Sequence, residues 1–320
     1  MVERIIGASA AAPTVRRITV DEGSAGQRLD NFLLRELKGV PKTHVYRVIR
    51  SGEVRVNSGR AGADTRLASG DEVRVPPVRM AEAPAPAPAR EFPLIFEDEQ
   101  LIAIDKPAGV AVHGGSGVAF GVIEQLRRAR PQAKFLELVH RLDKETSGLL
   151  LLAKKRSALT ALQQQLRTRG MGKTYAALVF GAWPANRKVI DLALHKTQDA
   201  QGERRVRVVT SDHADGRRSV SLVAVRQRHA GYTLLDVTIK TGRTHQIRVH
   251  LAHEGHAIVG DPKYGDFARN RELARGALQF TRMFLHARAL TFDHPASGER
   301  LQLEAPLPAD CAQLLERLSA

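Results

Sequence analysis

One segment limits what this chain can fold into more than any other, the alternating Ala-Pro run at residues 81–90 (AEAPAPAPAR). Proline lacks a backbone N–H donor, so this run can form neither a regular helix nor a central strand. Such a composition is typical of a semi-extended linker between folded units. We therefore expect a flexible tail at 1–16, a small domain at 17–79, the linker at 80–91 and a large domain at 92–320.

The charge balance indicates the kind of partner. The 320 residues include 49 Lys and Arg against 34 Asp and Glu, a net charge of +15. A basic surface of this kind favours a polyanion: RNA, DNA or an acidic membrane. No apolar stretch approaches the length of a membrane span, and the first residues lack the apolar core of a signal peptide. The single cysteine, Cys311, excludes an intramolecular disulfide and fits a reducing cytoplasm.

Residues 17–79 predict two short helices followed by a basic hairpin. Apolar residues at helical spacing indicate helices at 28–37 (RLDNFLLREL) and 43–52 (THVYRVIRSG), and alternation indicates strands near 54–56 and 73–75. Five basic residues lie between positions 42 and 60 against one acid, which would form a phosphate-binding face or simply a solvated one. The basic residues are Lys42, Arg47, Arg50, Arg55 and Arg60.

The order of these elements, with GEVRVN and GDEVRVP, resembles the S4 domain of a ribosomal protein and of many RNA-modifying enzymes. The resemblance implies that Lys42, Arg47, Arg50 and Arg55 contact RNA.

The strongest functional pattern is HRLDKETSGLLLLAK at residues 140–154. Charged residues lead into a Thr-Ser-Gly turn, and the apolar run at 149–153 predicts a strand buried on both faces. The charges therefore lie on a loop at the end of a core strand, a common place for function. Asp143 lies between the cations Arg141 and Lys144, which favour the ionised carboxylate and so a nucleophile or base. The alternative is a loop carboxylate that caps a turn.

This stretch resembles the signature of the RluA-type pseudouridine synthases, which isomerise uridine in RNA. The resemblance implies that Asp143 is the catalytic residue and that Arg141 enters the RNA and supports the flipped nucleotide. It also implies an α+β fold, with a mixed, mainly antiparallel β-sheet in the catalytic domain and a small α+β S4-like domain before it. The segment DKPAG at 105–109 is similar to another shared motif and is expected to support the active-site cleft.

Two further segments continue the resemblance. In KTYAALVFG, a predicted strand at 173–181, the resemblance implies that Tyr175 stacks on the target base; a core tyrosine is the alternative. In TGRTHQIRVHLAHEGH at 241–256, Thr244 is expected to cap a helix, which places Arg243 at the corner between strand and helix. The resemblance implies that Arg243 pairs with Asp143 and orients it; a surface arginine is the alternative.

Other classes of function fit less well. Four histidines occur in the last segment, but their spacing is not that of zinc proteases and no acidic ligand is near, so we expect no metal site. A glycoside hydrolase needs a pair of carboxylates, and a metal-dependent nuclease needs a cluster. A non-catalytic RNA-binding or ribosome-assembly protein remains the alternative, although binding alone would not need Asp143, Tyr175 and Arg243. The histidines are His245, His250, His253 and His256.

The resemblance implies a reaction that breaks the uridine C1′–N1 bond, turns the base and rejoins it through C5. Nothing is oxidised and no group is lost, so we expect no cofactor. The N-terminal segment is most similar to members that modify large-subunit ribosomal RNA, which implies that partner, and we expect a cytoplasmic monomer. Whether Asp143 attacks C1′, attacks C6 or abstracts a proton is open, as are the target uridines.

Overall fold

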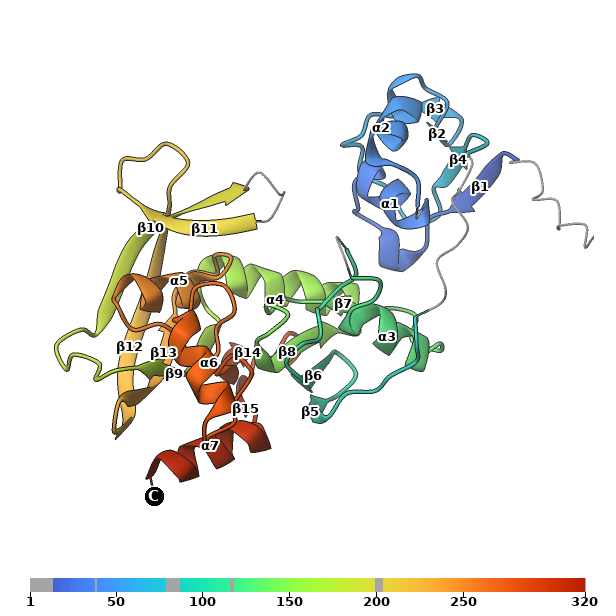
Figure 1. Cartoon of the computed structure of the whole chain (residues 1–320). Coiled ribbons are helices and arrows are strands. Elements are labelled where there is room, and N and C mark those ends of the chain that lie inside the picture. Colours follow the sequence, from blue (N-terminus) through green and yellow to red (C-terminus); the bar gives the residue numbers. More distant parts are fainter. Residues whose placement is uncertain (1–13, 38, 79–86, 116–117, 199–203, 320) are drawn as a thin grey trace, which may run out of the picture. The chain divides into compact units, whose positions relative to one another are not determined.

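The computed structural model describes most of the chain, which divides into two compact units, residues 1–86 and 87–320 (Figure 1). Most of the predicted tail and part of the predicted linker lie outside the described residues. The residues described are 14–37, 39–78, 87–115, 118–198 and 204–319.

The first unit packs two helices on a small sheet. As predicted, α1 (Leu29–Glu36) and α2 (Lys42–Arg50) bury their apolar residues against each other and against the strands. The sheet has the order β1-β4-β2-β3, and its paired strands are antiparallel. A 3₁₀ turn at Glu22–Ser24 precedes α1. The strands are β1 (Arg16–Thr19), β2 (Arg55–Val56), β3 (Gly59–Arg60) and β4 (Glu72–Val75).

The second unit is built on an eleven-stranded sheet with the order β11-β10-β12-β13-β9-β14-β8-β6-β5, with β15 beside β14 and β7 beside β8. Pairing is antiparallel except between β14 and β8, so the predicted mixed, mainly antiparallel fold is confirmed. The strands are β5 (Leu94–Glu97), β6 (Leu101–Lys106), β7 (Glu137–Leu138), β8 (Ser147–Ala153), β9 (Gly172–Phe180), β10 (Val189–Gln198), β11 (Arg204–Val209), β12 (Arg217–His229), β13 (Tyr232–Ile239), β14 (Leu285–Asp293) and β15 (Arg300–Glu304).

Helices cover this sheet at separate places. Helix α4 packs on β8 and β14, whereas α5 packs on β10, β11 and β12 (Figure 1). The helices are α3 (Val122–Ala129), α4 (Arg156–Thr168), α5 (Gln246–His253), α6 (Phe267–Arg275) and α7 (Ala309–Ser319).

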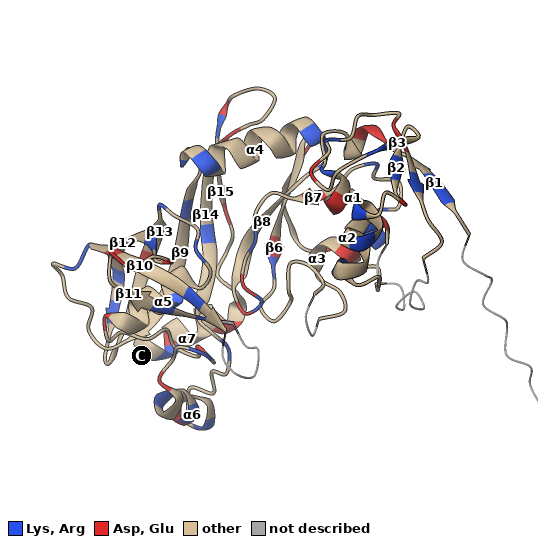
Figure 2. Cartoon of the chain, turned by 90° about the horizontal axis from the view of Figure 1, so that it is seen from above, with Lys and Arg blue, Asp and Glu red and all other residues tan. Residues whose placement is uncertain are grey.

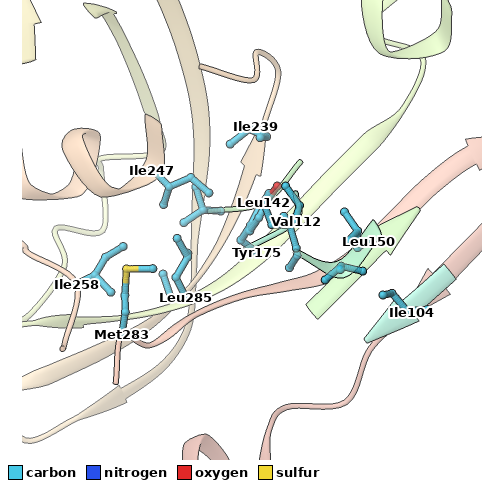
Figure 3. Packing of buried hydrophobic residues seen from close by; sticks show 14 of the residues in the cluster. Ile104, Val112, Leu142, Leu150, Tyr175, Ile239, Ile247, Ile258, Met283 and Leu285 are labelled. Atoms are coloured by element: carbon cyan, nitrogen blue, oxygen red, sulfur yellow. The ribbon is translucent and has the colours of Figure 1, made fainter. Parts of the chain in front are cut away.

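Strand β8 lies inside the sheet, between β14 and β6. All seven of its residues are buried, as predicted for the apolar run. Successive side chains of a strand point to opposite faces, so Leu149 and Leu151 join one core while Leu150 and Leu152 join another. Figure 3 shows the second of these cores, in which Leu150 lies near Ile104. The loop before β8 therefore leads into a strand that is fixed by packing on both of its faces.

The turn at the start of β8 requires a glycine at position 148. Its φ is 105°, a value that side chains with a Cβ rarely adopt. A Cβ atom there would lie 2.3 Å from the carbonyl oxygen of Ala287 on β14. Only glycine lets β14 come this close to the end of the loop.

Candidate active site

One cavity of about 350 Å³ brings together the four residues predicted in this domain, Arg141, Asp143, Tyr175 and Arg243. The loop before β8 forms one wall, the start of β9 the second, and the segment that leads into α5 the third. Residues about 100 positions apart in the sequence thus face one space.

The DKPAG motif anchors the loop that carries Asp143. The Lys106 ammonium is fully buried and donates to the carbonyl oxygens of Pro107 and Val110, each at 2.8 Å, and of Lys144 at 3.1 Å. Burial lowers the pKa of Lys106 to about 7, but three carbonyl acceptors match the three N–H donors of the charged form. The Gly109 N–H donates to the same Lys144 oxygen at 2.9 Å. The backbone directly after Asp143 is therefore fixed by the neighbouring loop.

The Asp143 carboxylate is held from one side. Arg248 Nη1 lies 3.3 Å from Asp143 Oδ2, and His245 Nε2 lies 3.9 Å from the same oxygen. Burial lowers the pKa of His245 against the opposing effect of Asp143, so the imidazole is neutral at pH 7. Within the described part of the chain, Asp143 Oδ1 accepts no hydrogen bond, and the side chain is 21% exposed. One carboxylate oxygen is thus open to a ligand in the cavity.

Arg248 owes its position to Asp261. Its Nε and Nη2 each donate to one oxygen of the Asp261 carboxylate at 2.8 Å, and both side chains are almost fully buried. Burial alone would raise the pKa of Asp261, but the Arg248 hydrogen bonds lower it. The guanidinium is planar and fork-shaped, so pairing on one edge fixes the nitrogen that faces Asp143.

The ion pair predicted between Arg243 and Asp143 is formed by Arg248 instead. Thr244 does not cap α5; His245 precedes the helix in a left-handed conformation, with a φ of 53°. The helix therefore starts at Gln246 and turns Arg248 inward, where it is 4% exposed. Arg243 stays before the helix, exposed at the rim of the cavity, with its backbone N–H bonded to Gln246 Oε1 at 3.1 Å.

Tyr175 lies on β9 with an exposed fraction of 8%. Figure 3 shows it beside Leu142 among the buried apolar residues. Burial, and then the nearby Asp143 charge, raise the pKa of its phenol, so the group stays protonated. The apolar side chains of Ile239, Ile247 and Leu285 line the cavity as well, so the ring lies in an apolar part of its wall.

Two residues of the site, Asp261 and Tyr264, were not predicted from the sequence. Asp261 follows β-bridged Ile258 in the segment after α5, and Tyr264 lies three residues later. The Tyr264 ring centre is 5.2 Å from the Arg248 guanidinium, and its hydroxyl bonds to His245 Nδ1 at 2.8 Å. The hydroxyl also accepts from the Val206 N–H of β11 at 3.0 Å. Their segment reads VGDPKYG, whose Asp and Tyr could have been considered as supports.

The basic residues predicted to bind RNA in the first unit lie at its surface. Lys42, Arg47 and Arg50 are exposed on α2, and Arg55 is half-buried on β2. None of the four forms an ion pair with a residue that the structure describes. Their charges are therefore available to an anion.

The histidines and the helices can be located in the structure. Within the described ranges, no group of three or more His, Cys, Asp or Glu side chains is arranged to hold a metal ion. Of the histidines considered above, His250 is fully buried against Ser221. Across the same ranges, no helix is long and apolar enough to span a membrane.

Comparison with known proteins identifies the class to which this fold and site belong. Residues 100–253 match the family described as RNA pseudouridylate synthase, and residues 27–73 match the S4 domain. The chain belongs to the RNA pseudouridylate synthase family, so the predictions of family, fold and enzyme class are confirmed.

Within this family, the chain is similar over almost its whole length to proteins that share one name. "Ribosomal large subunit pseudouridine synthase C" of Escherichia coli (strain K12) is 47% identical over 314 residues, 96% of this chain and 97% of the relative. The protein of the same name from Pasteurella multocida (strain Pm70) is 48% identical over 312 residues, 95% and 94% of the two chains. The structure of "Human RNA Pseudouridylate Synthase Domain Containing 4" superposes with a TM-score of 0.58 and 27% identity, covering 71% of this chain and 93% of that one.

Proposed function

We propose that this protein isomerises specific uridines of large-subunit ribosomal RNA to pseudouridine. The observation that carries the proposal is one cavity lined by Tyr175 and by Asp143, which Arg248 holds at one oxygen only. The chain matches synthases of that name over almost its whole length. The target base enters by leaving its stack, which costs a few kcal/mol, and the Tyr175 ring restores part of the lost stacking.

Asp143 is the catalytic residue of this proposal. Its free Oδ1 faces the nucleotide while Arg248 holds Oδ2, so the carboxylate is oriented toward the substrate and can act as the nucleophile or the base. The C1′–N1 bond breaks, the base turns, the C1′–C5 bond forms, the C5 hydrogen leaves as a proton, and N1 takes up a proton from water. The exposed Arg141 at the rim fills the space that the flipped nucleotide leaves, and Arg243 contacts the backbone of the RNA.

The first unit supplies binding rather than chemistry. Lys42, Arg47, Arg50 and Arg55 neutralise phosphates of the same RNA, and an Ala/Pro-rich linker at 80–91 connects the two activities. The enzyme needs no metal or other cofactor in this proposal, because the isomerisation has no redox step and keeps every heavy atom of the substrate. We further propose that it works as a monomer in the cytoplasm.

Tritium release from protein-free large-subunit ribosomal RNA made with [5-³H]uridine tests this function. Isomerisation must lose the C5 hydrogen, so we expect release by the wild type and none by Asp143→Asn, which is nearly isosteric and keeps the fold. Sequencing the product RNA then locates the sites. Tight RNA binding with no release by the wild type would favour a binding or ribosome-assembly protein, and release by both proteins would exclude the role of Asp143.

A further inference from the structure

Helix α6 carries a stripe of exposed residues that the proposed reaction does not use. Phe267 keeps 50% of its surface exposed, and Arg271 and Arg275 follow it at intervals of four residues, both exposed. Positions four apart lie on one face of a helix, about 6 Å from each other, so the three residues form one α6 stripe. Neither arginine forms an ion pair with any residue in the described ranges. Figure 2 shows the basic residues of this helix.

The opposite face fixes the helix to the unit. Leu273 is 6% exposed and packs into a buried apolar cluster, and the Arg269 guanidinium lies 4.1 Å from the centre of the Phe180 ring. The Asn270 side chain accepts from the Gly260 N–H at 2.8 Å and donates to the Asp261 carbonyl oxygen at 3.1 Å. Three different contacts hold this face, so the α6 stripe is a rigid surface that points to solvent.

The stripe begins beside the catalytic cavity. Tyr264 bonds to His245, which lines the cavity, and Phe267 is only three residues further along the chain. Consecutive Cα atoms are 3.8 Å apart, so the Cα atoms of Tyr264 and Phe267 are separated by at most about 11 Å. The connection is closed tightly, because a Cβ at Gly265 would lie 2.2 Å from the Asp261 carbonyl oxygen.

We propose that the α6 stripe binds an unpaired segment of the substrate RNA next to the target uridine, with Phe267 stacked on a base and the two arginines on phosphates. An exposed aromatic ring next to cations is the usual surface for single-stranded RNA, because every base can stack and every nucleotide carries a phosphate. Two acidic residues lie on or next to this helix. Glu272 faces solvent, whereas the Asp266 carboxylate caps the helix and accepts hydrogen bonds from two backbone N–H groups. The proposal rests on the proposed function for the identity of the RNA.

Filter binding and tritium release with protein-free large-subunit ribosomal RNA, run in parallel, test this surface. For Phe267→Ala we expect Kd and KM to rise roughly tenfold with kcat unchanged, and for Phe267→Trp we expect values near the wild type. The double variant Arg271→Gln, Arg275→Gln should reduce the slope of log Kd against log salt by about two. Val189→Ala, which trims an exposed apolar residue on β10, and Glu272→Gln on α6 itself are the matched controls.

Photocrosslinking with RNA that contains 5-iodouridine provides a direct readout of the contact. We expect a crosslinked peptide that contains Phe267, and its loss in Phe267→Ala but not in Glu272→Gln. A wild-type Kd and KM for Phe267→Ala, or an equal rise in the Val189→Ala control, would overturn the proposal. If the wild type binds RNA without releasing tritium, the proposed function fails, while the Kd difference between wild type and Phe267→Ala still decides the role of the stripe.

Discussion

Two carboxylates, one in each unit, face an arginine and lie near a tyrosine, and they are held in opposite ways. Asp30 accepts two hydrogen bonds from Arg28, one from the Tyr46 hydroxyl at 3.1 Å and one from the Asn31 N–H at 2.8 Å. From the residues that the structure describes, Asp143 accepts a single long hydrogen bond, at 3.3 Å, and its donor is an arginine that is paired with another acid. A carboxylate whose acceptor sites are filled stabilises the fold, whereas one left partly open can act on a ligand.

The largest effect on stability and on kcat is expected when the pairing of Asp143 with Arg248 is broken. Arg248→Met removes the partner of Asp143 and leaves Asp261 buried without its cation, which should cost about 3–5 kcal/mol of unfolding free energy. The carboxylate also loses its orientation, so we expect kcat to fall roughly 10²-fold or more. Denaturant unfolding and tritium release measure the two effects. Arg243→Gln, at the exposed rim, is the control; an equal loss of kcat in that variant would return the orienting role to Arg243.

Acid should destabilise the second unit at a higher pH than the first. Burial lowers the pKa of His250 and of His286 to about 4, so between pH 6.5 and 4 the unfolded second unit binds protons that the folded one does not. Its stability should therefore fall with pH in this window, by up to roughly 3 kcal/mol per histidine. Arg28 lowers the pKa of Asp30, so the stability from that pair is present above the ordinary value of 3.8 and is lost only as pH falls below it.

Thermal melting followed by calorimetry from pH 7 to pH 4 measures this difference. The transition of the second unit should shift to lower temperature while that of the first stays nearly constant. His286→Gln should make the shift smaller. Parallel shifts of both transitions would contradict the assignment of acid sensitivity to these buried imidazoles.

Removing the charge of the saturated carboxylate tests the other side of the comparison. Asp30→Asn keeps the shape but loses the charge-assisted bonds from Arg28, and we expect the first unit to lose about 1–3 kcal/mol of stability. Because Asp30 belongs to the first unit, kcat should not change. Denaturant unfolding monitored by amide exchange in α1, with tritium release alongside, checks both parts. A reduced kcat at unchanged stability would mean that Asp30 is no mere structural group.

The smallest effects come from the two tyrosine hydroxyls. Tyr264→Phe loses the bonds to His245 and to the Val206 N–H, which should cost about 1 kcal/mol and lower kcat a fewfold through the altered imidazole. Tyr46→Phe loses only the bond to Asp30 and should cost a similar free energy with no change in kcat. The two variants should lose a similar free energy of unfolding. A lower kcat in Tyr264→Phe alone would mean that the Tyr264 hydroxyl contributes to catalysis, and an unchanged kcat in both would contradict this role.

The strongly patterned parts of the chain could be predicted from the sequence. The apolar run of β8, the strand that carries Tyr175 and the two helices of the first unit each follow from local periodicity. The cavity that contains Arg141, Asp143 and Tyr175 follows from the family resemblance, since no spacing rule joins residues so far apart.

The identity of the orienting arginine could not be predicted because it depends on helix phase. Arg243 and Arg248 lie five residues apart in one motif, and the start of α5 decides which faces inward. The left-handed His245 sets that start, and the bond between its ring and Tyr264, nineteen positions away, accompanies this conformation. Local propensity favours Thr244 as the cap, and a tertiary contact overrides it.

The bond between Tyr264 and Val206 links the outer strand of the sheet to the residues that hold Asp143. Strand β11 lies at the end of the sheet, where an amide that points outward would exchange its hydrogen with water rapidly. The Val206 amide instead points to a hydroxyl whose ring lies against Arg248. Its deuterium uptake therefore reports on the packing of Tyr264 against Arg248, and a nucleotide that tightens this packing should slow the exchange of this one amide.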